Sequence, residues 1–92
     1  MSAENVWKTT FSSWPTGIPR RGVLVNSLNE AMPFKSFLIR EEMLLLERTN
    51  PDPLGSRFIL LGFESISSVR FIDPIKESLL NGAGFVGKLS QN

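Results

Sequence analysis

Five short apolar clusters between Arg21 and Ile72 constrain the fold most strongly. They are rich in Val, Ile, Leu and Phe, and turn-forming residues separate them. Clusters of this length and composition are typical of β-strands. The sequence therefore predicts strands near residues 21–28, 33–40, 43–49, 57–63 and 66–72. The longest connection is the 50–56 loop, whose two prolines lack the amide proton that a strand ladder needs.

A short helix is expected on each side of the strands. Trp7, Phe11 and Trp14 have the spacing of one helical face and predict a helix from about Ala3 to Ser13, with Ser2 as its cap. The two tryptophans are expected to form a lid over the strands.

The second helix is predicted over residues 73–82. Asp73 stands as its cap, Pro74 at its first position and Gly82 just past its end. The tail after it, residues 83–92, is either an arm that docks on a neighbour or a frayed end.

The chain is short enough to be a single domain. Its 92 residues form one unit, 1–92, divided into an N-terminal helix and turn (1–19), a β-barrel (20–72) and a C-terminal helix and tail (73–92).

The composition excludes most side-chain catalysis. The chain has no Cys, His or Tyr. It therefore lacks thiolate ligands, the usual base near neutral pH and the commonest zinc ligand. Glu41 and Glu42 are adjacent, so on an extended chain they point to opposite faces. We expect no enzyme activity, no metal and no cofactor.

The charge and hydropathy patterns leave the choice of partner open. The net charge of +1 provides no global field for nucleic acid, so RNA binding requires a local patch. No apolar stretch reaches the roughly 20 residues that span a bilayer, and Met1 to Asn5 lacks the start of a signal peptide. A cytoplasmic protein without a membrane partner is expected.

Two strands are apolar on both faces, the 43–46 and 58–61 segments. A lone small barrel would leave one face of these strands in water. The N-terminal helix can cover part of that face, and a neighbouring subunit is expected to cover the rest. With Leu60 pointing into the barrel, the face to be covered would carry Leu44, Leu46, Ile59 and Leu61. Unpaired edges at the fourth and fifth strands would drive the assembly.

Two segments carry a resemblance to the Sm-like family. Residues 40–46 resemble the turn and third strand of the Sm1 motif, with Met43 at its methionine, and residues 45–49 are similar to the bacterial host-factor (Hfq) version. Residues 63–69 resemble the Hfq-type Sm2 stretch, with matches at Ile66, Ser67 and Val69. Gly62 alternatively stands at the glycine of the eukaryotic Sm2 pattern.

The resemblance implies a five-stranded SH3-like or Sm-like barrel, a closed homo-oligomeric ring of roughly five to seven subunits, and RNA as the ligand. The departures fall on the uridine pocket. Arg40 and Leu44 stand where the Sm1 pattern has aspartate and asparagine, and Glu42 replaces the stacking aromatic residue of Hfq. Phe63 and Glu64 replace its lysine and histidine, and Leu61 replaces the eukaryotic arginine. The pocket is therefore not expected intact.

In such a ring the links after the second and fourth strands face the central pore. They would place there Arg40, Glu41, Glu42, Gly62, Phe63 and Glu64. Phe63 could stack on a base and Arg40 could meet phosphate. Alternatively, Phe63 packs in the core and Arg40 pairs with a nearby glutamate.

A second candidate RNA surface is a lateral rim of Arg20, Arg21 and Lys35. These cations could instead pair with an acidic partner subunit. The sequence therefore predicts a ring that binds single-stranded RNA, with a structural ring that scaffolds proteins as the alternative.

Overall fold

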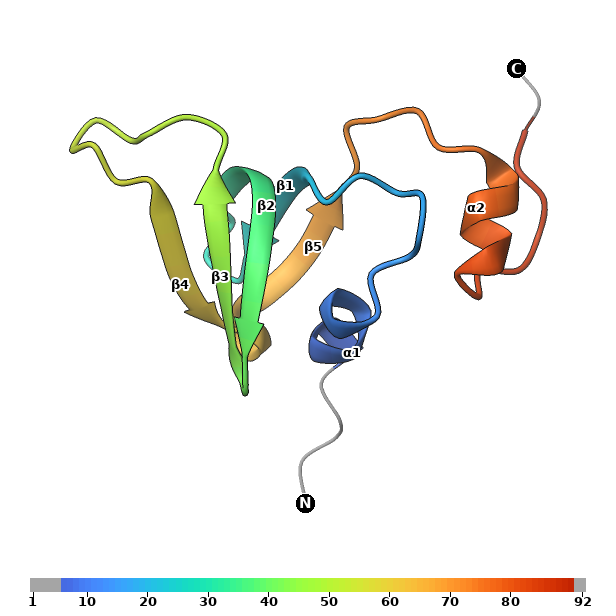
Figure 1. Ribbon diagram of the computed structural model, residues 1–92, viewed down its shortest axis with the longest axis horizontal. Coiled ribbons are helices and arrows are strands. Elements are labelled where there is room, and N and C mark those ends of the chain that lie inside the picture. The colour runs from blue at the N-terminus through green and yellow to red at the C-terminus, as the bar shows by residue number, and fades with distance from the viewer. Residues whose placement is uncertain (1–5, 91–92) are drawn as a thin grey trace.

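The computed structural model describes residues 6–90. Two short helices flank five strands, and a 3-10 turn joins the last two strands (Figure 1). In chain order the elements are α1 Val6–Ser12, β1 Gly22–Asn26, β2 Ala31–Arg40, β3 Met43–Arg48, β4 Phe58–Gly62, η1 Phe63–Ser65, β5 Ile66–Arg70 and α2 Glu77–Gly82. All five predicted strands are present, with ends that differ from the prediction by at most two residues.

The strands form one antiparallel sheet in the order β4-β3-β2-β1-β5. β4 and β5 are its edges, as the sequence predicted. The sheet is not closed by pairing between them, so the predicted barrel is not confirmed. In Figure 1, β4 and β5 lie at opposite sides of the sheet and their arrowheads point in opposite directions.

Local side-chain bonds explain where β1 ends. Oδ1 of Asn26 accepts hydrogen bonds from the backbone amides of Leu28 and Glu30, at 3.0 and 2.9 Å. Short polar side chains that bond to nearby amides in this way favour turns over strands. Asn29 completes the turn with a φ of 64°, in the left-handed region that asparagine tolerates.

The register of the ladder shows which face of β3 and β4 is buried. This face is the opposite of the one that the sequence predicted. Leu44 and Leu46 are fully buried, and their partners on β4 are Leu61 and Ile59, which pack against the core. Leu60 is 61% exposed on the opposite face. The prediction was wrong because both faces of these strands are apolar, so no alternation marks the inner one.

The core is built mainly from phenylalanines. Phe11 of α1, Phe34 and Phe37 of β2, and Phe63 of η1 are at most 1% exposed. Their rings meet at centroid distances of 4.8 to 6.4 Å. In Figure 1, α1 lies beside the concave sheet.

Trp7 and Trp14 pack against this core, as expected of a lid. The predicted start of α1 and its cap at Ser2 lie outside the described residues.

α2 begins later than the sequence predicted. Asp73 does not cap it, because its carboxylate accepts hydrogen bonds from Arg21, and the helix begins at Glu77 after Lys76. Gly82 lies in the helix rather than beyond it. The turn after the helix is made by Gly84, with a φ of 103°.

The end of α2 has the hydrogen bonds of a Schellman motif. The amides of Gly84 and Phe85 donate to the carbonyls of Asn81 and Leu80, at 3.0 and 3.1 Å. No residue of α2 is buried. Within residues 6–90, no helix is long and apolar enough to cross a membrane.

Candidate nucleic-acid interface

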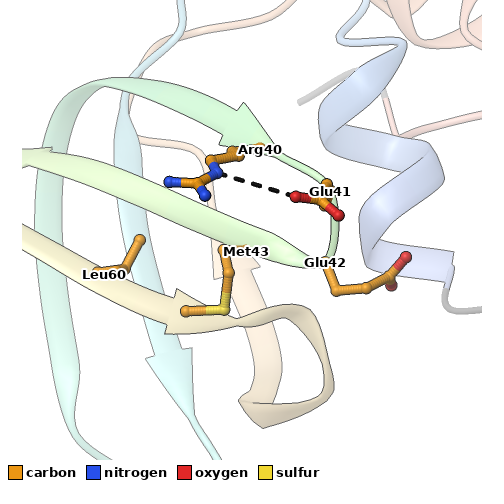
Figure 2. Close-up of a pocket in the computed structure, with 5 residues that line it drawn as sticks. All are labelled: Arg40, Glu41, Glu42, Met43 and Leu60. Carbon is orange, nitrogen blue, oxygen red and sulfur yellow. Dashed lines mark ion pairs between the residues drawn. The ribbon is translucent and has the colours of Figure 1, made fainter.

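The β2–β3 hairpin turn carries three of the predicted pore residues. Arg40 pairs with Met43 in the ladder, so Glu41 and Glu42 form a two-residue turn. Glu41 has a φ of 53°, which is uncommon for a residue other than glycine. Figure 2 shows Arg40 and Glu41 on one side of the turn and Glu42 extending toward α1.

Each charge of this turn has a partner of opposite sign in the same chain. Nε of Arg40 lies 3.8 Å from a carboxylate oxygen of Glu41, and both side chains are more than 80% exposed. Such exposed pairs contribute little to stability. Glu42 accepts a hydrogen bond from Lys8, which ties the turn to α1. The alternative in which Arg40 pairs with a glutamate is therefore the one observed.

The structure brings the links after β2 and β4 together. Gly62 is the ladder partner of Met43, and the amide of Phe63 donates to the carbonyl of Glu42 at 3.3 Å. Glu64 is exposed and folds over Gly62: its Oε1 lies 2.5 Å from the position that a Cβ on Gly62 would occupy. Glycine at position 62 thus makes room for this carboxylate.

Phe63 cannot stack on a base in this structure. Its side chain is 0% exposed and belongs to the core, with its ring 6.2 Å from that of Phe11. The packing alternative therefore holds for this residue. With Phe63 inside, the joined links present Arg40 and Lys8 against three glutamates, so carboxylates are in slight excess and the surface does not favour phosphate.

The predicted rim residue Arg20 is built into the fold. Its Nη2 donates to the carbonyl of Phe37 at 2.7 Å, and its guanidinium carbon lies 3.7 Å from the centroid of the Phe37 ring. The contact combines a hydrogen bond with a cation–π interaction. Sequence reasoning missed it, because the two residues are separated by 17 positions.

Arg21 and Lys35 also have partners within the chain. Nε of Arg21 donates to Oδ2 of Asp73 at 2.9 Å. The hydrogen bonds from Arg21 hold the pKa of Asp73 below its usual value, and the same contact raises the pKa of Arg21. Nζ of Lys35 lies 3.9 Å from Glu47. The acidic partners predicted for a neighbouring subunit are thus present in this chain.

Two arginines that the sequence analysis did not single out are better placed for an anion. Arg57 directly precedes β4 and Arg70 ends β5, and both are exposed. Within residues 6–90, neither side chain makes an ion pair with a carboxylate. The signal that could have found them is their position at the two ends of the edge strands.

A shallow apolar groove crosses the outer face of β2, β3 and β4. Leu60 lies opposite Leu45 in the ladder, and Leu45 lies opposite Leu38. Two adjoining hollows, of about 330 and 380 Å³, share Arg40, Met43 and Leu60 in their lining. Figure 2 shows the end of this groove that lies at the hairpin turn.

Among the described residues, no group of three or more acidic side chains is arranged to hold a metal ion. A scan against protein-family models, a search of curated proteins and a search of solved structures gave no match to this chain. The interpretation of function therefore depends on the edges of the sheet, the arginines and the groove.

Proposed function

We propose that the protein is an Sm-like subunit that assembles into a closed homo-oligomeric ring of roughly five to seven copies and binds single-stranded RNA along an outer rim. One observation carries the assembly: the sheet is open, with β4 and β5 as its unpaired edges, and in Figure 1 the β4 arrow points down whereas the β5 arrow points up. A neighbour turned so that its β5 runs antiparallel to β4 can extend the sheet. Repetition of this heterologous contact closes a ring.

The β4 edge favours such pairing over exposure to water. Phe58 and Leu60 are 55% and 61% exposed, and the strand contains no proline, lysine or charged residue that would block a second strand. An exposed apolar edge of this kind is a site of strand addition or aggregation. Pairing with β5 would satisfy its backbone groups.

The arginines at the strand ends support RNA as the ligand. Val23 is the ladder partner of Arg70, so the segment with Arg20 and Arg21 adjoins the end of β5. An antiparallel pair would set Arg70 of one subunit near Arg57 of the next. Each junction would then gather several cations, and a phosphate backbone would relieve their mutual repulsion. RNA bound in this way is expected to show little sequence preference.

A scaffold ring that does not bind RNA is the second candidate. The specific observation in its favour is that Arg21, Lys35 and Arg40 each lie beside a carboxylate of the same chain. Burial of Phe63 also removes the one aromatic stacking residue proposed for the pore.

Salt-titrated binding to short uridine-rich and adenine-rich RNAs tests the proposal. The wild-type chain should bind both with similar affinity, and the affinity should fall steeply with salt. Arg57→Ala combined with Arg70→Ala removes two side chains without ion pairs to carboxylates within residues 6–90, so the fold should survive. If both contact phosphate, the slope of log K against log salt should fall by about 1.4 (two contacts at about 0.7 each for single strands).

Controls distinguish the candidates. Arg57→Lys combined with Arg70→Lys keeps both positive charges and should leave the slope unchanged. A ring that binds neither RNA at low salt would support the scaffold function and overturn RNA binding. A chain that sediments only as a monomer at micromolar concentration would overturn the ring itself.

A further inference from the structure

The segment after β5 forms an arm that stands apart from the sheet. Residues 71–90, here called the C-terminal arm, comprise an extended connection, α2 and the tail that follows it (Figure 1). The radius of gyration of the chain is 14.2 Å, whereas a compact domain of this length has about 12 Å. The arm contributes to this extension, because it projects from the sheet on the side away from β4 (Figure 1).

The arm is ordered, yet much of its surface is apolar. The tail folds back on α2, since the amide of Leu89 donates to Oε1 of Glu77 at 2.9 Å. Phe85, Val86 and Leu89 are nevertheless 62%, 97% and 56% exposed. A folded segment that turns large apolar side chains to water is typical of one half of an interface.

A second uncovered apolar surface is the groove on the outer face of β2, β3 and β4. Its central row is Leu38, Leu45 and Leu60, of which Leu38 and Leu60 are 67% and 61% exposed. The arm of the same chain does not cover this groove in the conformation observed, because α2 lies at the opposite side of the picture from β3 and β4, which carry the groove (Figure 1). A second copy of the chain supplies an arm for this groove and a groove for this arm.

We propose that the C-terminal arm of one subunit docks into the outer groove of the next subunit. The proposal rests on the proposed ring, because pairing of β5 with a neighbour's β4 places the start of the arm beside that neighbour's groove. An antiparallel pair would set residue 71 near Phe58, two positions before Leu60.

The connection is long enough to reach the whole groove. Residues 71–76 lie between β5 and α2, and six extended residues span about 20 Å. The distance from an added strand to β2 is three strand spacings, about 14 Å. α2 and its tail can therefore lie across the row of leucines while β5 stays paired with β4.

The charges of the two surfaces are compatible. Glu41 and Glu47 at the margin of the groove lie beside Arg40 and Lys35, and Glu42 is paired with Lys8, so the margin has no excess of positive charge. Residues 76–90 carry Lys76 and Lys88 against Glu77, so cations are in excess there. A neighbour's arm would thus meet no like-charge repulsion at the groove.

Disulfide trapping tests the contact directly, because the chain has no cysteine of its own. Leu60→Cys places one thiol in the groove, and Val86→Cys places one on the arm. Under mild oxidation the mixture of the two variants should form disulfide-linked dimers, whereas neither variant should form them alone. Leu54→Cys, at a side chain 95% exposed in the β3–β4 loop, is the matched control. Mixed with Val86→Cys, it should give few or no dimers.

Sedimentation of the same variants separates the possible outcomes. An oligomer that forms no 60-to-86 disulfide would overturn arm docking and leave the ring standing. Dimers formed by Leu60→Cys alone would show that the grooves pack face to face and would also overturn it. A monomer without disulfides would overturn both the ring and the docking.

A charged side chain on the arm tests how much the docked arm contributes to the affinity of self-association. Val86→Asp should weaken self-association on the order of tenfold, because it puts a carboxylate against leucines. Leu54→Asp should leave association unchanged. Equal affinities for Val86→Asp and the wild type would contradict the docking.

Discussion

The sheet with α1 and the C-terminal arm are built from similar residues but differ in burial. Three aromatic side chains and one guanidinium pack around the Phe37 ring: Phe11, Trp14, Phe34 and Arg20. α2 has no buried residue, although it contains two leucines. Stability is therefore concentrated in the sheet, while the arm retains apolar surface.

The difference in burial shows how weakly the arm is attached to the rest of the chain. Three contacts tie it to residues 14–21: the Phe71 ring is 5.7 Å from that of Trp14, Asp73 bonds to Arg21, and Leu79 lies close to Gly17. A segment with so few buried contacts opens at lower free energy than the core. Such a segment can move to a partner without unfolding the sheet.

The largest expected effect is the difference in stability between an aspartate on the buried face of the sheet and an aspartate on its exposed face. Leu46→Asp buries an unpaired charge at a fully buried site, which costs several kcal/mol and should prevent folding. Leu60→Asp places the same group on the exposed face and should leave a folded monomer. Circular dichroism and denaturant unfolding of both variants check this. Unfolding by Leu60→Asp with a folded Leu46→Asp would reverse the register.

The next effect contrasts one phenylalanine of the core with one of the arm. Phe37→Ala should lower the free energy of unfolding by about 3–5 kcal/mol, because it removes a fully buried ring and leaves a cavity. Phe85→Ala, at a ring 62% exposed, should change it by no more than about 0.5 kcal/mol. Urea titration at low protein concentration, where the chain is monomeric, measures both. Equal losses would remove the distinction between sheet and arm.

A pair of glycines in the arm should show a local effect. Gly84 has a φ of 103°, so Gly84→Ala should weaken the end of α2 by about 1 kcal/mol. Gly82 lies within the helix with open space at its Cβ position, so Gly82→Ala should strengthen α2 by a similar amount.

Hydrogen exchange reports these two changes. The amides of Gly84 and Phe85 should exchange faster in the first variant and more slowly in the second. The midpoint of global unfolding should not move in either. A shift of that midpoint would mean that the arm and the sheet unfold together.

The smallest effect concerns the ion pair that joins the arm to the sheet. Folding lowers the pKa of Asp73 through its hydrogen bonds with Arg21. The pair therefore stabilises the folded chain at any pH above the ordinary value of 3.8, and this contribution is lost as the pH falls through the lowered pKa.

Protection of the arm amides, measured relative to the intrinsic exchange rate at each pH, should accordingly fall in acid below pH 3.8. Asp73→Asn should abolish this pH dependence, and the amides of β2 should not respond. An arm whose protection is insensitive to acid would show that Arg21 does not hold it. Because both groups lie at the surface, salt should reduce the effect.

Much of the strand arrangement could be read from residues close in sequence. The prolines of the 50–56 loop act on their own neighbours, so the ends of β3 and β4 could be predicted to within one residue. The predicted first strand ran two residues past Asn26, whose side chain closes the turn after β1. The start of α2 could not be predicted. Asp73 is a good cap by local rules, but an arginine 52 positions away occupies its carboxylate.

The candidate site depended still more on distant contacts. Arg20 and Arg21 form the densest basic cluster of the sequence, yet one packs on Phe37 and the other pairs with Asp73. Arg57 and Arg70 stand at the ends of strands that the sequence already predicted as edges, but only the structure shows that, within residues 6–90, neither side chain has a carboxylate partner. Sequence spacing does not report which cations remain without a carboxylate.

The sequence by itself determined the strands, the helical positions of Trp7 and Phe11, and the lack of the common catalytic side chains, because propensity, turn chemistry and composition are local properties. Only the tertiary structure decided which face of β4 is buried, that Phe63 lies inside and that the sheet stays open. Where both faces of a strand are apolar, burial is set by pairing and packing across the sheet. The ladder between Leu46 and Ile59 turns Leu60 outward.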